Sequence, residues 1–330
     1  MRIVVDAMGS DDYPQPDVAG AVLAAREFGD EIILVGDESR VRAELARHDV
    51  AGLRIAVHHA GEVIEMTDKP SAASRSKKDS SMHVGLNLVK EGSADAFVSA
   101  GNTGAILAVA MLQTLRRIAG IKRPALGVTF PTPTRPLLID NGANADCQPD
   151  YLLQFALMGS LFVERVQGIP RPRVALISNG EEEGKGNTLI KETLPLLEAS
   201  GLNFIGNIEP KEFMQGATDV AVTDGFTGNI MIKTAEAVAA HLLGLVRTEL
   251  MSSTRTKIGG LLAKPAFRRV GQALDPDEVG GAPLLGVNGV VIVAHGRSNA
   301  YAIKQAVGQA RLSVQNDVVG AIRAGLQAKE

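Results

Sequence analysis

The amino-acid sequence predicts an α/β fold in which a mostly parallel β-sheet carries helices on both faces. Two observations predict it. Continuous runs rich in β-branched residues, typical of strands that are buried on both faces, alternate with helical patterns along the chain. Each run is followed by a loop of Gly, Asn, Asp or Ser residues, where the chain leaves a strand for the next helix. No linker divides the sequence, so we expect residues 1–330 to form a single α/β domain.

The strand-and-loop units recur along the chain. They are 3–6 with 7–11, 96–99 with 100–104, 137–140 with 141–144, 174–178 with 179–187, 220–223 with 224–229, and 290–294 with 295–299. We expect a helix from about Asp17 after the first unit and an apolar helix through Leu115 after the second. Loops that follow parallel strands meet at one edge of a sheet, which is where ligands bind. One such loop alone would be an ordinary turn, but six predict a binding site.

Composition narrows the class of protein. Hydrophobic residues make up 45% of the chain and charged residues 22%, which excludes wholesale disorder. The formal net charge of -3 disfavours a dedicated nucleic-acid binder. Cys147 is the single cysteine, so the chain has no internal disulfide or cysteine zinc site, which indicates a reducing cytoplasm. Glycine accounts for 35 of 330 residues, and the predicted loops contain many of them.

No targeting or membrane-spanning segment is expected. Asp6 comes too early for the apolar region of a signal peptide. No run is expected to reach the roughly 20 apolar residues that a spanning helix needs. We therefore expect a soluble protein, with contact at a membrane surface left open.

The loops have the chemistry of a phosphate site. Backbone N–H groups of a glycine-rich loop that opens a helix attract an anion, and the helix dipole adds to the attraction. Lys185, Lys233 and Arg297 supply positive charge at the same edge. Neutral donors are expected from Asn102, Thr103, Asn144, Asn187, Thr227 and Asn229.

Familiar motifs do not fit these loops. The nucleotide P-loop needs four residues between its glycines, but Gly180 and Gly184 enclose three. A dinucleotide G-x-G-x-x-G and a G-x-S-x-G nucleophile elbow are absent from the sequence. Cys147 has no evident base in the sequence, so a small buried residue is the simpler interpretation.

The remaining titratable residues have ordinary interpretations beside the functional ones. His295 follows a buried type of strand and is either a proton donor or phosphate ligand, or a histidine satisfied at a strand end. Three consecutive acids at 181–183 cannot all face one metal ion, so a solvated loop is expected there. Asp6, Asp140 and Asp224 each end a strand, where an acid caps the N–H groups of the next loop.

A basic amphipathic stretch lies between Glu249 and Asp275, with no acid between them. Pro265 and Gly259-Gly260 are expected to break it into short helical pieces. Such a segment binds an anionic membrane surface or an acidic protein, or it packs in a dimer, and the sequence leaves these alternatives open. Its candidate contact residues are Arg255, Lys257, Leu261, Leu262, Lys264, Phe267, Arg268 and Arg269.

The ordered set of loops resembles the PlsX family of phosphate acyltransferases of bacterial phospholipid synthesis. The resemblance extends from Val5-Asp6-Ala7-Met8-Gly9 to the C-terminal helix. Its most specific stretches are Ser80-Ser81-Met82, Ser99-Ala100-Gly101-Asn102-Thr103-Gly104, Asp140-Asn141-Gly142-Ala143-Asn144, Thr223-Asp224-Gly225-Phe226-Thr227-Gly228-Asn229 and Ala294-His295-Gly296. Two positions depart from the family pattern: Ser10 replaces a usual Gly, and Arg297 makes the loop after His295-Gly296 more polar.

The resemblance implies transfer of a fatty acyl group from acyl carrier protein to inorganic phosphate, giving acyl-phosphate. It also implies a Rossmann-like three-layer α/β/α fold related to phosphotransacetylases and isopropylmalate dehydrogenases. A homodimer, peripheral attachment to the inner face of the membrane, and a glycerol-3-phosphate acyltransferase that uses the product are further implications. The amphipathic segment, about 240–275, is then the dimer or membrane contact.

On this reading, phosphate attacks the thioester directly, without a covalent acyl-enzyme, a metal or a cofactor beyond the carrier's phosphopantetheine. The candidate catalytic residues are Lys185, Asn229 and His295. The candidate phosphate and substrate residues are Gly101, Asn102, Thr103, Asn144, Asn179, Asn187, Asp224, Thr227 and Lys233. Docking of the acidic carrier is expected at basic residues that include Lys122 and Arg123. The alternatives are a phosphotransacetylase-like enzyme that uses coenzyme A thioesters, an NAD-dependent decarboxylating dehydrogenase, and a non-catalytic membrane scaffold.

Overall fold

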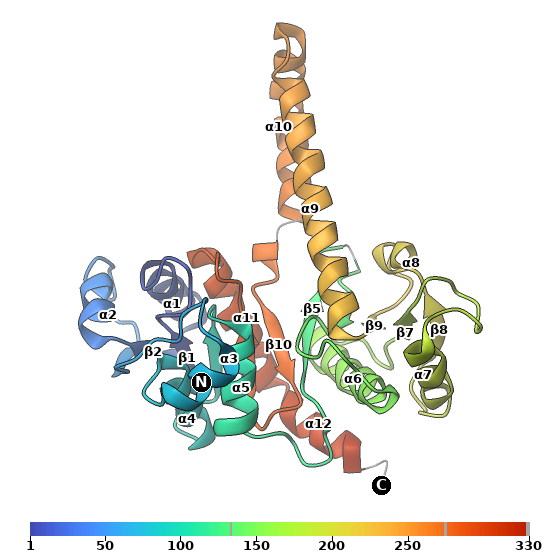
Figure 1. Ribbon diagram of the computed structural model, residues 1–330. Coiled ribbons are helices and arrows are strands. Elements are labelled where there is room, and N and C mark those ends of the chain that lie inside the picture. The colour runs from blue at the N-terminus through green and yellow to red at the C-terminus, as the bar shows by residue number, and fades with distance from the viewer. Residues whose placement is uncertain (133, 274–275, 328–330) are drawn as a thin grey trace.

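One β-sheet runs through the molecule (Figure 1). The computed structural model describes residues 1–132, 134–273 and 276–327. Within these residues the sheet has 11 strands. In order across the sheet they are β3 (Ile55–His59), β2 (Glu31–Gly36), β1 (Arg2–Asp6), β4 (Ala96–Ser99), β11 (Val290–Val293), β10 (Ala282–Leu285), β5 (Ala125–Thr129), β6 (Leu137–Ile139), β9 (Val220–Val222), β7 (Val174–Ile177) and β8 (Phe204–Ile208).

The helices follow in chain order, and most of them cover one or the other face of this sheet (Figure 1). They are α1 (Gln15–Phe28), α2 (Glu38–Leu45), α3 (Pro70–Ser76), α4 (Ser81–Lys90), α5 (Thr103–Ala108) continued by the π-helix η1 (Val109–Gln113), α6 (Pro149–Phe162) continued by the π-helix η2 (Val163–Gln167), α7 (Thr188–Glu198), α8 (Pro210–Met214), α9 (Gly225–Leu250), α10 (Thr254–Ala273), the 3-10 helix η3 (Pro276–Glu278), α11 (Ala300–Gln315) and α12 (Val318–Gln327). The first helix begins at Gln15, two residues before the expected Asp17.

Four apolar clusters fill the space between the sheet and these helices. In the first half, α1 and α11 pack on one face of the sheet, while α4, α5 and η1 pack on the other. In the second half, α6, α7 and α12 cover one face, and α8 with the start of α9 covers the other. Large buried side chains such as Phe97, Phe155 and Phe213 lie in these layers. The three-layer α/β/α architecture expected from the sequence is confirmed.

The direction of the strands corrects one expectation. β10 runs antiparallel to both β11 and β5, and β6 runs antiparallel to β5. The parallel set that contains β1, β4 and β11 therefore points opposite to the set that contains β6, β9 and β7. The six loops consequently belong to two sheet edges. A sheet twist of roughly 20–25° per strand, accumulated over the steps between β1 and β9, turns those edges toward one another.

The amphipathic segment is a helical hairpin that stands out from the body of the molecule (Figure 1). α9 spans 26 residues and begins within the body of the protein, well before the expected segment of about 240–275, whose end at Asp275 lies outside the described residues. α10 continues through Gly259, Gly260 and Pro265, so the expectation of short broken pieces is wrong. Pro265 removes one main-chain hydrogen bond, but α10 continues through it and contacts α9 alongside.

α9 also corrects the expectation that no long apolar run is present. Among the described residues it is one helix that is long and apolar enough to cross a membrane, judged by length and composition alone. Its first turns nevertheless belong to the body of the protein. There Met231, Ile232 and Ala235 pack against the second half of the sheet.

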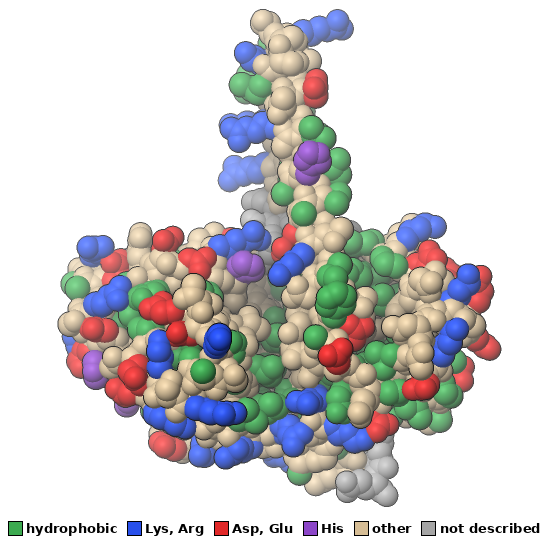
Figure 2. Space-filling model, viewed as in Figure 1, with side chains coloured by type: hydrophobic (Ala, Val, Ile, Leu, Met, Phe, Trp, Pro, Cys, Tyr) green, Lys and Arg blue, Asp and Glu red, His purple; other side chains and the backbone are tan. Residues whose placement is uncertain are grey.

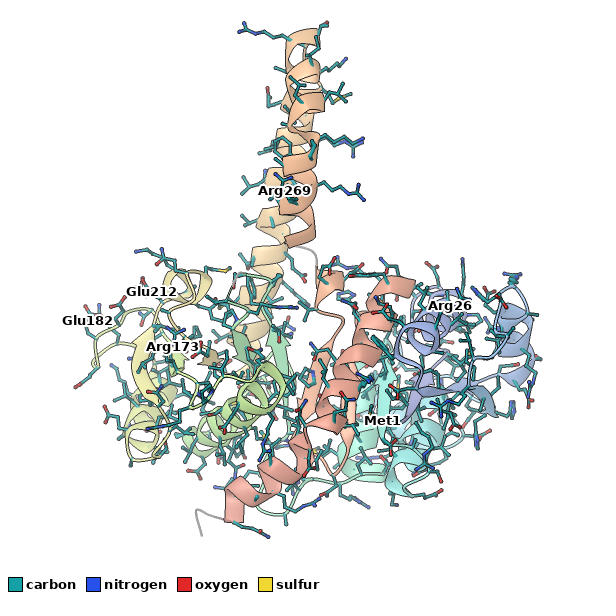
Figure 3. All side chains as sticks on the ribbon, turned by 180° about the vertical axis from the view of Figure 1, so that it is seen from behind. Met1, Arg26, Arg173, Glu182, Glu212 and Arg269 are labelled. Atoms are coloured by element: carbon teal, nitrogen blue, oxygen red, sulfur yellow. The ribbon has the colours of Figure 1, made fainter. Side chains whose placement is uncertain are left out.

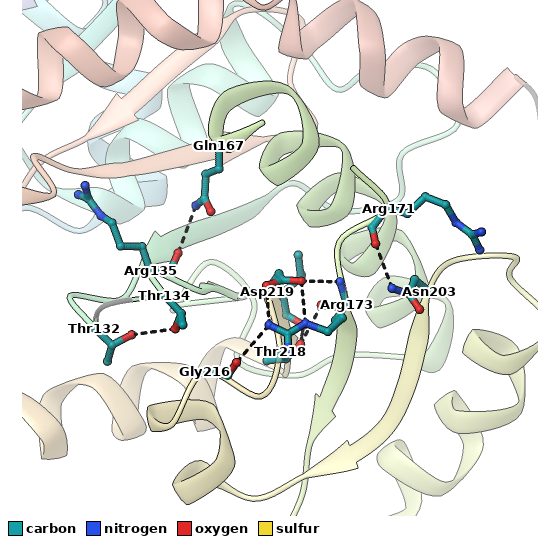
Figure 4. A network of polar contacts seen from close by, with 11 residues as sticks. Thr132, Thr134, Arg135, Gln167, Arg171, Arg173, Asn203, Gly216, Thr218 and Asp219 are labelled. Carbon is teal, nitrogen blue, oxygen red and sulfur yellow. Dashed lines mark hydrogen bonds and ion pairs between the residues drawn. The ribbon is translucent and has the colours of Figure 1, made fainter. Parts of the chain in front are cut away.

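An ion pair joins the amino ends of β7 and β9, at the opposite end of these strands from the loops that follow them (Figure 4). Arg173 Nε donates to Asp219 Oδ2 at 3.0 Å and Arg173 Nη2 donates to Asp219 Oδ1 at 2.8 Å. Arg173 Nη2 also donates to the Gly216 carbonyl at 3.1 Å. This two-point contact fixes the start of the two strands and leaves their carboxyl ends free for the site.

Candidate functional site

The loops after β1 and β4 form one unit in the first half of the molecule. Asp6 accepts hydrogen bonds from the Met8 N–H at 3.0 Å and from Ser99 Oγ at 2.7 Å. Burial raises the pKa of the Asp6 carboxyl. A Cβ atom at Gly9 would lie 2.9 Å from the Gly101 nitrogen, so the close approach of these loops needs glycine. The capping role expected for Asp6 is confirmed.

The side chain of Asn102 makes hydrogen bonds that hold the loop after β4 in place, so it is not free to bind a ligand. Its Oδ1 accepts from the Ala105 N–H at 3.1 Å, which caps α5. Its Nδ2 donates to the Met66 carbonyl at 3.1 Å and to the Asp68 carbonyl at 3.3 Å. The expectation of Asn102 as a free amide donor is therefore wrong. Thr103 is exposed at the first turn of α5, where backbone N–H groups lack helical acceptors.

Asp140 organises the loop after β6. It accepts from the Leu126 N–H at 2.9 Å and from the Ala143 N–H at 3.2 Å. It also accepts from the Asn144 N–H at 2.7 Å and from Asn144 Nδ2 at 2.9 Å. Burial raises the pKa of this carboxyl. Asn144 Nδ2 donates to Pro124 as well, so this side chain shapes the loop and is not the free donor that the sequence suggests.

The loop after β9 lies directly against the loop after β6. Asp224 caps α9 by accepting from the Thr227 N–H and from Thr227 Oγ1, each at 2.8 Å. The Gly225 N–H donates to the Asn144 carbonyl at 2.8 Å. A Cβ atom at Gly228 would lie 2.1 Å from the Asp140 carbonyl oxygen, so only glycine fits there. The expected caps at Asp140 and Asp224 are both confirmed.

Two of the predicted site residues, Asn229 and Lys233, lie on α9 near this junction and do not take part in its hydrogen bonds. Asn229 is half-buried, and its Nδ2 lies 2.8 Å from the position of a Cβ on Gly142. Lys233 follows one turn later and is exposed. Within the part of the chain that the structure describes, neither side chain makes a hydrogen bond or ion pair. Both are thus available to a ligand.

The loop after β7 is more open. Asn179 Oδ1 accepts from the Gly186 N–H at 2.9 Å, and Asn187 Oδ1 caps α7 by accepting from Ile190 at 3.0 Å. Both Oδ1 atoms are thus used to hold the loop, and the expectation of Asn187 as a donor stays a prediction that concerns its Nδ2 group. Lys185 is exposed, and the acids at 181–183 are solvent-exposed as expected. No hydrogen bond or ion pair among the described residues joins Lys185 to the loops after β6 and β9.

The loop after β11 connects the two halves. His295 is exposed, and its Nδ1 accepts from the Arg297 N–H at 3.4 Å. Arg297 Nη2 lies 4.0 Å from Glu236 Oε1, and Glu236 is on α9, one turn after Lys233. His295 is thereby placed on the same side of the molecule as the α9 residues of the site.

Three buried side-chain oxygens near these loops were not predicted to matter. Asn141 Oδ1, Ser178 Oγ and Thr223 Oγ1 have no partner within the described residues. They follow or end three neighbouring strands, β6, β7 and β9. Their positions next to the predicted loops were visible in the sequence, but their lack of a partner was not.

Cys147 is poorly suited to nucleophilic catalysis. Burial, reinforced by the charge of Asp140, raises the pKa of its thiol to about 12. Its Sγ donates weakly to the Asn144 carbonyl at 3.5 Å. The interpretation of Cys147 as an inert small residue fits this environment.

The candidate contact residues of the basic segment lie on the hairpin, away from the loops. Figure 2 shows apolar and basic side chains along it, and Figure 3 shows Arg269 there. Leu261 is 71% exposed and Leu262 79% exposed, which is unusual for leucine. All the basic members are exposed as well: Arg255, Lys257, Lys264, Arg268 and Arg269.

Comparisons with known proteins agree with this fold. Residues 1–320 match a family model described as "Fatty acid synthesis protein". A phosphate acyltransferase of Geobacter sulfurreducens is 48% identical over 93% of this chain and 89% of the relative. A phosphate acyltransferase of Elusimicrobium minutum is 47% identical over 98% of this chain and 95% of the relative.

Solved structures are similar at the level of the fold. A phosphotransacetylase from Streptococcus pyogenes has a TM-score of 0.59 and 20% identity, over 94% of both chains. A 4-hydroxythreonine-4-phosphate dehydrogenase from Salmonella typhimurium has a TM-score of 0.54 and 13% identity, over 94% of this chain and 98% of the other. The expected relation to phosphotransacetylase-like and dehydrogenase-like folds is confirmed.

Proposed function

Because the chain belongs to the PlsX family of phosphate acyltransferases, we propose that it transfers a fatty acyl group from acyl carrier protein to inorganic phosphate. The product is an acyl-phosphate for phospholipid synthesis. Membership in this family makes the chain an acyltransferase with phosphate as acceptor. The carrier-bound donor is the finer part of the proposal.

The observation that carries the proposal is the junction of the loops after β6 and β9. Asp140 and Asp224 hold the two loops by accepting their inner N–H groups. Asn229 stands beside this junction, half-buried and with no hydrogen bond to other described residues. A helix N-terminus with a free amide donor and Lys233 one turn away suits a phosphate dianion.

The reaction needs little acid–base catalysis. A phosphate oxygen attacks the thioester carbonyl carbon and forms the new C–O bond. The tetrahedral oxyanion then collapses, the C–S bond breaks, and the electron pair leaves with sulfur. A thiol with a reference pKa of about 8.5 departs as thiolate, and water carries to it the proton that the phosphate group loses. The protein's task is to hold phosphate against the thioester and to stabilise the oxyanion.

The roles of the residues follow from charge and position. Lys185 and Lys233 supply positive charge for phosphate, and Asn229 donates to phosphate or to the oxyanion. His295 serves as a proton donor or phosphate ligand at the facing loop. Direct attack requires no acyl-enzyme, metal or organic cofactor, since the phosphopantetheine arrives as part of the donor.

The test is an assay of acyl-phosphate formation, trapped as the hydroxamate, with acyl carrier protein and coenzyme A thioesters compared as donors. We expect the carrier thioester to give the higher kcat/KM and chelators to leave the rate unchanged. A preference for coenzyme A would favour the phosphotransacetylase-like alternative. Absence of turnover with both donors would favour the scaffold alternative.

The hairpin α9–α10 is proposed to mediate assembly and membrane contact. Its exposed leucines and basic side chains suit an anionic bilayer, and the apolar side chains along α9 suit a second copy of the chain. We propose a homodimer that attaches to the inner face of the membrane, from which a glycerol-3-phosphate acyltransferase takes the product. Sedimentation velocity tests the dimer. Flotation with anionic and neutral vesicles, using Leu261→Glu and Leu262→Glu, tests the membrane contact.

A further inference from the structure

A cavity of about 330 Å³ lies in the first half of the molecule, beside the loops of the site. Its walls are the loop after β1 and the segment that leads to α3. The lining residues are Met8, Gly9, Ser10, Asp11, Tyr13, Ile64, Glu65, Met66 and Thr67. The volume lies at the lower end of the range for small-molecule sites. None of these residues is among the candidate site residues named above.

The walls of this cavity are held in place from several sides. Ser10 Oγ donates to the buried Asp17 carboxyl group at 2.5 Å, which holds Ser10 in place. Tyr13 Oη donates to Glu65 Oε1 at 3.0 Å and so connects the two walls. The Asp11 N–H donates to the Gly296 carbonyl at 2.8 Å, which connects the cavity to the His295 loop.

The inner end of the cavity adjoins the acyl-transfer site. Met66 is held by Asn102, which caps α5. A Cβ atom at Gly296 would lie 2.6 Å from Met66 Cε and 2.7 Å from Asp11 Oδ1. A ligand in the cavity can thus reach the loops at 101–104 and 295–297 with one end.

The chemistry of the lining selects a class of ligand. Asp11 and Glu65 place negative charge at the cavity, and its lining contains no cation. A free phosphate or a nucleotide phosphate is disfavoured inside it. Methionine, isoleucine and tyrosine side chains beside serine and threonine hydroxyls suit a neutral, elongated ligand with amide N–H and hydroxyl groups.

A cation stands at the outer end. The Arg40 guanidinium lies 4.9 Å above the Tyr13 ring, and its Nη2 donates to the Tyr13 carbonyl at 3.4 Å. Arg40 itself is exposed on α2. The order along the cavity is therefore a cation at Tyr13, neutral to acidic walls, and the loops at 101–104 and 295–297.

This order matches a phosphopantetheine arm, which has a phosphodiester, two amides and a terminal thioester. We propose that the cavity binds this arm, with the phosphodiester at Arg40 and the thioester toward the loop at 295–297. The inference rests on the proposed function, because it identifies how the acyl donor of that reaction enters. It assigns donor recognition to residues of the first half, separate from the phosphate junction at Asn229.

The test uses three variants: Arg40→Gln, Thr67→Trp and the control Arg42→Gln. Thr67 is exposed at the cavity wall, so an indole there fills the space without disturbing the core. Arg42 is also on α2 and exposed, but it pairs with Glu38 at 2.7 Å. Residues two apart on a helix do not share a face, so Arg42 is a matched control.

We expect Arg40→Gln to raise KM for the acyl donor about fivefold and to leave KM for phosphate unchanged. The effect should be equal for acyl carrier protein and acyl coenzyme A, because both carry the arm. Thr67→Trp should abolish donor saturation, and Arg42→Gln should match wild type. An effect on coenzyme A alone would overturn the inference, since it would mean recognition of the nucleotide part.

A binding measurement separates this inference from the proposed function. 4′-Phosphopantetheine alone, titrated calorimetrically, should bind wild type and Arg42→Gln, bind Arg40→Gln more weakly, and not bind Thr67→Trp. Binding that is absent in wild type or unchanged in Thr67→Trp would overturn the inference even if the enzyme turns over. Specific binding without turnover would leave the cavity assignment standing and defeat the proposed function.

Discussion

Arg297 and Glu236 form an ion pair of 4.0 Å between the loop after β11 and the helix after β9. It connects the two halves beside the proposed phosphate junction. Because Arg297 is largely exposed and Glu236 is partly exposed, the pair is weak and a phosphate anion can compete for the arginine.

We expect Glu236→Gln to release Arg297 and lower KM for phosphate about threefold, and Arg297→Gln to raise it by a similar factor. Steady-state kinetics with phosphate varied at saturating donor measures both. The double variant should match Arg297→Gln alone, because Glu236 acts through the arginine. Independent, additive effects would show that Glu236 influences phosphate by another route.

Asn229→Ala and Lys185→Ala should each reduce kcat without loss of folding. For Asn229 we expect a loss of about 10²-fold, typical of removing one donor from an oxyanion or phosphate site. Lys211→Ala is the control, because Lys211 is exposed and its ion pair with Glu212 is long at 3.8 Å. Activity is measured with thermal unfolding in parallel. Wild-type turnover in both site variants would mean that the active loops are elsewhere.

Gly228→Ala should destabilise the protein by about 2–4 kcal/mol. The added Cβ would lie 2.1 Å from the Asp140 carbonyl oxygen, so the loops after β6 and β9 would have to separate. Gly244 lies on the same helix with nothing within 4 Å of an added Cβ. Gly244→Ala should stabilise by about 0.5–1 kcal/mol through helix propensity. Urea unfolding of both variants measures the contrast, and equal effects would refute the close contact.

Asp17 makes stability depend on pH. Burial raises the pKa of its carboxyl to about 8, with the charge of Asp6 adding to the rise, from an ordinary value of 3.8. The folded state holds this proton more tightly, so its contribution is fully present below about pH 4 and is lost as pH rises through about 8. We expect the free energy of unfolding to fall with a slope approaching 1.4 kcal/mol per pH unit inside this window.

Asp17→Asn isolates that effect. The amide mimics the protonated acid and cannot ionise. The free energy of unfolding should therefore fall less steeply between pH 5 and 7, by about 1.4 kcal/mol per pH unit. Denaturant unfolding at several pH values gives the two curves. A slope that is identical in wild type and Asp17→Asn would show that Asp17 is not the titrating group.

Cys147 should resist alkylation. With a thiol pKa near 12, almost no thiolate is present at pH 8. We expect iodoacetamide to modify the unfolded chain and to leave the folded protein unmodified, as intact mass reports. Cys147→Ser should keep wild-type turnover. Recovery of an acylated Cys147 during catalysis would contradict direct attack by phosphate.

Much of the fold was predictable because its signals are local. The β-branched runs and the acids at their ends, such as Asp140 and Asp224, mark strands and caps within a few residues. The antiparallel strand β10 was not predictable, because its pairing with β5 and β11 joins segments far apart in the sequence. The antiparallel pairing of β5 with β6 then reverses the second parallel set and divides the loops between two sheet edges.

The site was predictable at the level of loops and less so at the level of side chains. Asn102, Asn144 and Asn187 are in the expected loops, but their side chains hold these loops together. Asn102 and Asn187 accept from backbone N–H groups at helix starts, and Asn144 donates to the Pro124 carbonyl and to Asp140. The segment Ile64–Thr67 has no periodic pattern or motif. Only the tertiary structure shows that it encloses a cavity.

The position of β11 has a consequence for synthesis of the chain. This strand lies between β4 and β10 at the centre of the sheet, yet it is contributed by residues 290–293. α11, which follows it, packs against α1 near the start of the chain. The emerging polypeptide therefore cannot close its first half until almost the whole chain has left the ribosome, and the edges of β4 and β10 stay unpaired until then. Protection of these edges during translation is a requirement that this topology imposes on the cell.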